Sequence, residues 1–237
     1  NKESANRFTL KKTEIPDFTS LNINLEDSDL NIEESPNEKS YIEYAQATKD
    51  KKNPVSYSIE NGTLTLKEAG NTGASYYINV DISFLQAALS SKNIEDYTKE
   101  SSKYENYVTL YLPKDKLVSS AKIYLGYGDF YVKNAAFDTI NIKLDDGDFD
   151  ANTLTANSGK LTFSYGDCDL QKASLGNISL TSKDGDLTVN ELTLSGKTKI
   201  ALSYGDAEMT PQRKYLDLTS PPIMERLLLL VLTETKR

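Results

Sequence analysis

Apolar residues recur in the second half of the chain as short alternating runs on either side of a Gly-Asp pair. Such alternation places the apolar side chains on one face of a strand, and the glycine between two runs marks a corner. The pair returns at spacings of 19, 19, 19 and 20 residues. A fixed short period of this kind is typical of solenoid proteins. The corner pairs are Gly128-Asp129, Gly147-Asp148, Gly166-Asp167, Gly185-Asp186 and Gly205-Asp206.

Matched residues around each corner form columns. Apolar residues stand five and three positions before the glycine, two and four positions after it, and again seven and nine positions after it. Each coil therefore has about five side chains that it can bury only against a neighbouring coil, with the coils stacked at about 4.8 Å. The two columns before the glycine are Ile123, Ile142, Leu161, Leu180 and Ile200, and Leu125, Leu144, Phe163, Ser182 and Leu202.

The repeat predicts an all-β fold, a right-handed single-stranded parallel β-solenoid with coils of 19–20 residues. The right hand follows from the strong preference of parallel crossovers for that connection. We expect a lead-in at 1–17, a solenoid domain at 18–210, and a tail at 211–237. Within the domain, the regular coils occupy 117–210 and a capping elaboration occupies 36–112.

The N-terminal half fits the same frame only in part. Residues 18–35 carry the apolar columns with Ser28 in place of the corner glycine, which predicts an outlying coil in the same stack. Residues 55–67 predict a β-hairpin with a type I′ turn at Asn61-Gly62. Further strands are expected at 76–84 and 107–112, and a short helix at 84–91. These antiparallel elements would cap the open edge of the stack, which would otherwise template aggregation.

The tail at 211–237 departs from the repeat. It holds three of the seven prolines and three of the four arginines, and the next corner glycine is due at Met224. Read in a shifted frame, the codons of this region can encode the repeat pattern, so we expect a frameshifted sixth coil. A genuine C-terminal cap is the alternative, since the ends of solenoids are atypical.

Composition excludes several kinds of chemistry. The chain has 27 basic and 35 acidic residues, a formal charge of −8 and no histidine. Histidine-dependent nucleophile pairs and His-ligated zinc are therefore excluded. Cys168 is the only cysteine and stands in an apolar column, which predicts a buried structural residue. No basic stripe is evident, so nucleic acid and anionic lipid are unexpected partners.

The corners and their lead-in resemble the bacterial "putative adhesin" β-strand-repeat domains, a group that includes LiaG-like proteins of Gram-positive envelope-stress operons. The resemblance rests on the Tyr-Gly-Asp and Asp-Gly-Asp corners and on the segments 108–113 and 121–128. It covers about residues 18–210. It implies an extracytoplasmic, cell-surface domain tethered by an upstream membrane helix outside this sequence, with no assigned catalytic residue.

The aspartate column Asp129, Asp148, Asp167, Asp186 and Asp206 is the most prominent chemical feature. Carboxylates one coil apart repel one another unless something compensates. We favour a structural role in which each accepts backbone N–H groups at its own or the next corner. A calcium ladder is the alternative, and otherwise we expect no metal or cofactor.

The residue before each glycine alternates between tyrosine and aspartate: Tyr127, Asp146, Tyr165, Asp184 and Tyr204. Strand alternation from Leu125 places this column at or near the inside, so we favour a packing role in which phenol and acid pair. Partner binding by Tyr127, Tyr165 and Tyr204 is the alternative, because exposed tyrosines suit protein or glycan contacts.

These observations predict a non-catalytic, adhesin-like scaffold at the cell surface, acting in envelope-stress sensing or in binding an envelope protein or a cell-wall glycan. The competing class is a calcium-dependent or glycan-directed β-helix enzyme, such as a polysaccharide lyase or hydrolase. A catalytic acid pair would be singular and recessed, whereas the acids here are regular and repeated.

Overall fold

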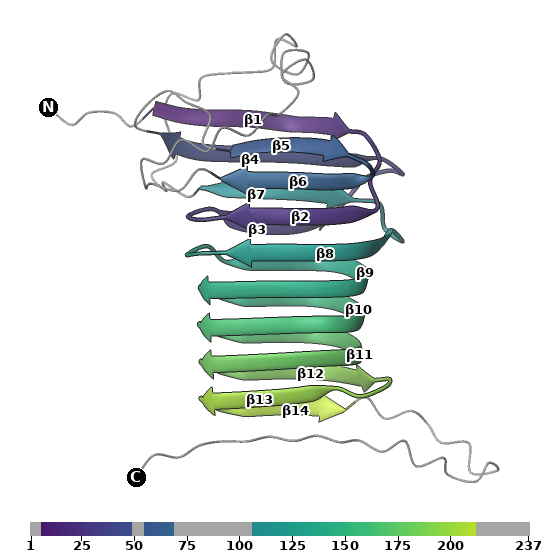
Figure 1. Cartoon of the computed structure of the whole chain (residues 1–237), viewed down its shortest axis with the longest axis vertical. Coiled ribbons are helices and arrows are strands. Elements are labelled where there is room, and N and C mark those ends of the chain that lie inside the picture. The colour runs from purple at the N-terminus through teal and green to yellow at the C-terminus, as the bar shows by residue number, and fades with distance from the viewer. Residues whose placement is uncertain (1–5, 49–54, 69–105, 212–237) are drawn as a thin grey trace, which may run out of the picture.

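The computed structural model describes residues 6–48, 55–68 and 106–211, which form a single 14-stranded β structure (Figure 1). The regular coils pass from β8 to β14, and β9, β10 and β11 each run unbroken through 17 residues between two corners. The strands of this part are β8 (Leu117–Leu125), β9 (Phe130–Asp146), β10 (Phe149–Tyr165), β11 (Cys168–Asp184), β12 (Leu187–Leu194), β13 (Lys199–Tyr204) and β14 (Ala207–Pro211).

Successive coils pair in parallel and in the predicted register. Ile123 lies beside Ile142, and the same column continues through Leu161, Leu180 and Ile200. These side chains are at most 1% exposed. The parallel β-solenoid and its stacked columns are therefore confirmed, while the right-handed coil stays a prediction.

The first coil belongs to the same stack, as predicted. β2 (Ser20–Leu25) lies between β6 (Thr63–Glu68) and β8, and β3 (Asp29–Glu34) lies between β7 (Tyr107–Leu112) and β9, all in parallel. The interval 36–112, predicted only as a capping elaboration, thus also supplies a further layer of the stack through β6 and β7.

Antiparallel strands cover the N-terminal end of this stack. β5 (Val55–Glu60) pairs with β6 through a turn at Asn61 and Gly62, whose φ angles of 49° and 74° confirm the type I′ hairpin. β4 (Ser40–Thr48) pairs with β7, and β1 (Asn6–Ile15) pairs with β4. The antiparallel cap is therefore confirmed.

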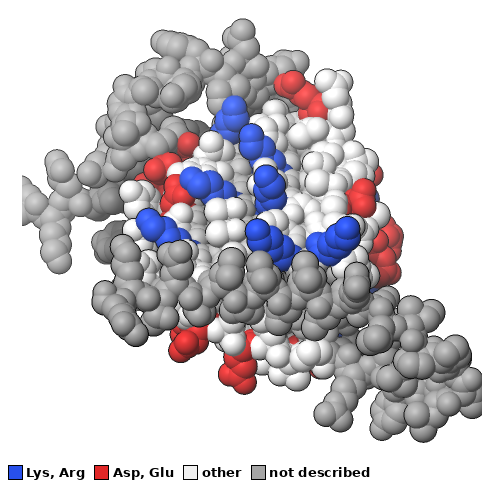
Figure 2. Space-filling model, turned by 60° about the horizontal axis from the view of Figure 1, so that its bottom comes forward, with Lys and Arg blue, Asp and Glu red and all other residues white. Residues whose placement is uncertain are grey.

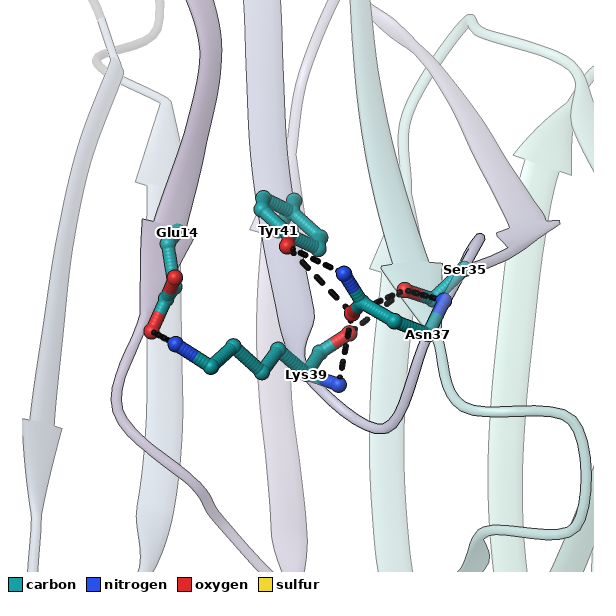
Figure 3. A network of polar contacts seen from close by, with 5 residues as sticks. All are labelled: Glu14, Ser35, Asn37, Lys39 and Tyr41. Carbon is teal, nitrogen blue, oxygen red and sulfur yellow. Dashed lines mark hydrogen bonds and ion pairs between the residues drawn. The ribbon is translucent and has the colours of Figure 1, made fainter.

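Polar contacts fix the connection that leads from β3 over β7 into β4 (Figure 3). Ser35 Oγ donates to the Lys39 carbonyl at 2.6 Å, and the Lys39 backbone N–H donates to Asn37 Oδ1 at 2.9 Å. Lys39 Nζ reaches Glu14 on β1 at 2.7 Å, and Asn37 Nδ2 donates to Tyr41 on β4 at 2.9 Å. The loop is thus tied to β1 and to β4.

A continuous apolar core fills the inside of the coil. Phe130, Phe149 and Phe163 form an aromatic stack, with ring centroids 5.0 and 5.6 Å apart. Each fully buried side chain of this size stabilises the fold by about 1.5–3 kcal/mol. Cys168 is 1% exposed, as predicted, and burial together with nearby carboxylates raises the pKa of its thiol.

The predicted strand at 76–84, the helix at 84–91 and nearly all of the tail, from residue 212 onward, lie outside the described residues. Those residues that are described contain no helix, and so none long and apolar enough to cross a membrane.

Candidate functional site

The corners of the coils lie one above another at the ends of β8, β9, β10, β11 and β13 (Figure 1). Gly166 shows why a glycine stands there. Its φ of +111° is strained for any residue with a Cβ, and a Cβ would also overlap the Gly147 carbonyl of the preceding corner. Backbone therefore packs directly on backbone from one corner to the next.

The aspartates that follow these glycines form a hydrogen-bonded ladder. Each backbone N–H in the column donates to the carboxylate one coil earlier, and each bond is 2.8 Å long. The favoured structural role of the column is thus what the geometry shows. A charge-assisted acceptor of this kind offsets the repulsion between carboxylates that lie one strand spacing apart. In order of donor to acceptor, the ladder runs Asp206, Asp186, Asp167, Asp148, Asp129 and Asp29.

The serine corner is held by a different carboxylate. Glu68, at the end of β6, accepts the backbone N–H groups of Glu26, Asp27 and Ser28 at 2.8, 2.9 and 3.1 Å. Its other oxygen accepts the Ser28 hydroxyl at 2.7 Å and the Gln46 amide at 2.8 Å. Sequence reasoning missed this residue, because Glu68 falls outside the repeat.

The tyrosine column points outward, so the predicted packing role at or near the inside is wrong. Tyr127 is 66% exposed, and Tyr165 and Tyr204 are each 49% exposed. The strand alternation that holds up to Leu125 stops at the corner, where the chain turns and presents the residue before the glycine to solvent. Among the described contacts of Tyr165 is Lys183 Nζ, 5.4 Å from the ring centroid.

Tyrosines and carboxylates therefore share one exposed edge, which we call the corner ridge. It consists of the column Tyr127, Asp146, Tyr165, Asp184 and Tyr204 and the neighbouring column Asp129, Asp148, Asp167, Asp186 and Asp206. Tyrosines recur on alternate coils, which separates them by about 10 Å. The structure thus brings the predicted corner aspartates and tyrosines together on a single edge.

Comparison with known proteins places the chain in a family. The family model described as Toastrack DUF4097 matches residues 18–220. The chain belongs to this Toastrack family. No curated protein matches the chain.

Solved structures with a similar fold cover most of the Toastrack chain at low identity. A "putative cell adhesion protein" from Clostridium sporogenes is 12% identical with a TM-score of 0.47, and covers 84% of this chain and 100% of its own. A "putative adhesin" from Bacteroides fragilis is 11% identical with a TM-score of 0.41, covering 88% and 96%. A "putative lipid binding protein" from Parabacteroides distasonis is 12% identical with a TM-score of 0.40, covering 87% and 93%.

Beside the corner ridge of the Toastrack domain, a second group of acids continues onto the following strands. Asp150 and Asp169 lie beside each other on β10 and β11. Burial raises the pKa of Asp150, and the charges of Asp169, Asp148, Asp129 and Asp167 raise it further. The ridge and its flank therefore concentrate negative charge.

The arrangement of these acids bears on two alternatives, a calcium ladder and a β-helix enzyme. Among the described residues, no group of three or more histidine, cysteine, aspartate or glutamate side chains is placed to hold a metal ion. Asp150 has the raised pKa expected of a general acid, yet it is exposed rather than recessed. The hydrogen bonds of the ladder are the contacts that a structural role of the acids predicts.

Proposed function

We propose that this Toastrack domain is a non-catalytic, adhesin-like scaffold of the cell surface that binds an envelope protein along the corner ridge. The exposure of three tyrosines at a regular spacing carries the proposal. An exposed tyrosine offers a large apolar contact with a polar tip and loses little conformational entropy on binding. Tyrosines of this kind are enriched where proteins meet.

The setting of these tyrosines supports a protein partner with basic residues. Carboxylates of the ladder flank each ring, and their positions are fixed by hydrogen bonds to the backbone of the next corner. Preorganised charges steer an oppositely charged partner and fix its register. Because the coils pack backbone on backbone, the ridge holds its spacing without reorganisation when a partner binds.

A triple variant, Y127S/Y165S/Y204S, tests this proposal. Wild-type and variant domains would be used to capture partners from a cell-envelope extract, and affinity for the recovered protein would then be measured with purified components. We expect the variant to lose at least tenfold in affinity, which corresponds to about 1.4 kcal/mol.

A matched control replaces three outward residues of a neighbouring column, which leaves the ridge intact: N152S, Q171S and N190S. The control is expected to bind as the wild type does. Equal loss in both variants, or no loss in either, contradicts a binding role of the tyrosines. Release of reducing ends from envelope polysaccharides by the purified domain contradicts the non-catalytic assignment.

A further inference from the structure

A second surface of the stack carries lysines. Five successive strands each present one exposed lysine on the same side, formed by β8, the later halves of β9, β10 and β11, and β13. Figure 2 shows lysines gathered on this side of the molecule. We call it the lysine face, and its members are Lys122, Lys143, Lys160, Lys183 and Lys199. The expectation that the chain lacks a basic stripe is therefore wrong.

Acids are nearly absent from this face. Across the residues 117–125, 139–145, 158–164, 177–183 and 199–203, the single acid is Asp145. It is occupied by Lys143 Nζ at 2.7 Å and by the Tyr124 hydroxyl at 2.8 Å. The chain as a whole has a formal charge of −8, so this face differs in sign from the average of the chain.

The lysines form a narrow zigzag along the stack. Lys122, Lys160 and Lys199 share one column and stand on every second coil, about 10 Å apart. Lys143 and Lys183 stand on the coils between them and one or two columns to the side. A lysine therefore recurs at about every 4.8 Å along the axis, within a strip about 14 Å wide, and Lys143 is the member that is paired with Asp145. Such a strip matches a linear polymer of negative charge.

Three observations narrow the class of polymer. The corner ridge borders the face, so an extended anionic plane such as a bilayer would meet its carboxylates within a Debye length of about 8 Å. Within the five strand segments the outward aromatic residue is Tyr124, whose hydroxyl is bound to Asp145 and whose ring lies 5.2 Å from Lys143 Nζ, so these segments offer nucleobases no open stacking platform. Between the lysines stand hydroxyl and amide side chains, which suit the hydroxyl groups of sugars and polyols. They are Ser120, Thr139, Asn141, Ser158, Thr162, Ser164, Ser179, Thr181 and Ser203.

We propose that the lysine face binds a linear anionic glycan, a sugar or polyol polymer with a carboxylate or phosphodiester in each repeat. The polymer lies along the stack axis, where successive charges meet successive coils. The face meets the corner ridge at Lys183, whose Nζ lies 5.4 Å from the centroid of the Tyr165 ring. The shared column of Lys122, Lys160 and Lys199 does not belong to the ridge, so its removal tests glycan binding independently of the proposed protein partner.

The test uses polygalacturonate and poly(glycerol phosphate) as carboxylate and phosphodiester probes, with neutral dextran as the uncharged control. The variant K122Q/K160Q/K199Q removes the shared lysine column. We expect about a tenfold loss of affinity for the preferred probe at low salt, and a slope of log K against log salt that is shallower by about 2. A preference for one probe identifies the charged group of the glycan.

A variant of equal charge on other surfaces provides the control: K114Q/K133Q/K172Q, at three exposed positions. It is expected to bind within about twofold of wild type, as is the ridge variant Y127S/Y204S, which leaves the contact between Lys183 and Tyr165 in place. Equal losses in the two lysine variants would overturn the proposal. Tighter binding of phosphatidylglycerol vesicles or single-stranded DNA than of either glycan probe would overturn it as well.

Discussion

The regular coils and the N-terminal end of the stack reach the same architecture in different ways. From β8 onward, each coil rests on the one before it in sequence, and the corner bond passes from one aspartate to the next. At the N-terminal end, β2 is held between β6 and β8, which lie about 40 and 100 residues away. There the corner at Ser28 is held by Glu68, which accepts five hydrogen bonds. A solenoid thus needs matched layers in space, and its layers need not follow the order of the sequence.

The largest expected effect comes from adding a Cβ to a regular corner. Gly166→Ala combines a strained positive φ with overlap of the Gly147 carbonyl, so we expect a loss of about 3 kcal/mol or more in the free energy of unfolding. Gly62→Ala in the N-terminal hairpin is the matched control. Its φ of +74° costs about 1 kcal/mol, and its Cβ would meet only Thr19 Oγ1 at 3.3 Å. Urea unfolding measures the free energy of unfolding of both variants. An equal loss in Gly166→Ala and Gly62→Ala would contradict backbone packing at the corner.

The next largest effect is expected at the substitute corner. Glu68→Gln replaces one of two acceptor oxygens by an amide that donates, so either the three backbone N–H groups or the Ser28 and Gln46 donors lose their acceptor. We expect destabilisation by about 2–3 kcal/mol. Glu60→Gln, at an exposed position at the hairpin end, is expected to change stability by less than about 0.5 kcal/mol. Thermal melts measure both variants. Equal changes in melting temperature for Glu68→Gln and Glu60→Gln would show that Glu68 does not organise the corner.

The aspartate ladder itself gives a smaller effect that depends on position. Asp167→Ala removes the acceptor of the Asp186 N–H and is expected to cost about 1–1.5 kcal/mol. Asp206 stands at the end of the ladder, and no described corner donates to its carboxylate. Asp206→Ala should therefore be nearly neutral. Equal destabilisation at both positions would argue against a ladder of acceptors.

The smallest effect concerns acid repulsion beside the ridge. Burial and the neighbouring carboxylates raise the pKa of Asp150 in the folded state, so the folded protein binds more protons than the unfolded chain just above the ordinary aspartate pKa of 3.8. Its unfavourable contribution therefore appears as pH rises through that window and is relieved as pH falls. Asp150→Asn should stabilise the domain at pH 7 by about 0.5 kcal/mol and lose this advantage below the window. Thermal melts at pH 3.5 and pH 7 measure this effect, with the exposed Asp115→Asn as the control. A lower melting temperature of Asp150→Asn than of the wild type at pH 7 would contradict the predicted repulsion.

The regular coils could be predicted because one period fixes both the corners and the apolar columns. The hairpin at Asn61-Gly62 could be predicted because its turn chemistry is local. Stacking of β6 and β7 on the first coil could not, since those segments depart from the period and pair across long stretches of chain.

The corner ridge and the lysine face could be predicted less well than the core. Leu125 and Tyr127 are two residues apart, which predicts the same orientation, yet the turn at the corner sends the tyrosine outward. The lysine face escaped detection for another reason. Its members stand 16 to 23 residues apart and shift between columns, so a composition count or a linear search for basic runs does not find them.

Distances across the stack test most directly the claim that all layers belong to a single stack of coils. Asn22 and Ser179 lie in one column, as do Lys122 and Lys199, and four strand spacings separate each pair. Nitroxide labels on each pair, in a Cys168→Ala background, should give the same backbone separation of about 19 Å although the pairs are 157 and 77 residues apart. Dipolar spectroscopy that returned different or broadly scattered distances for the two pairs would contradict a single stack of coils.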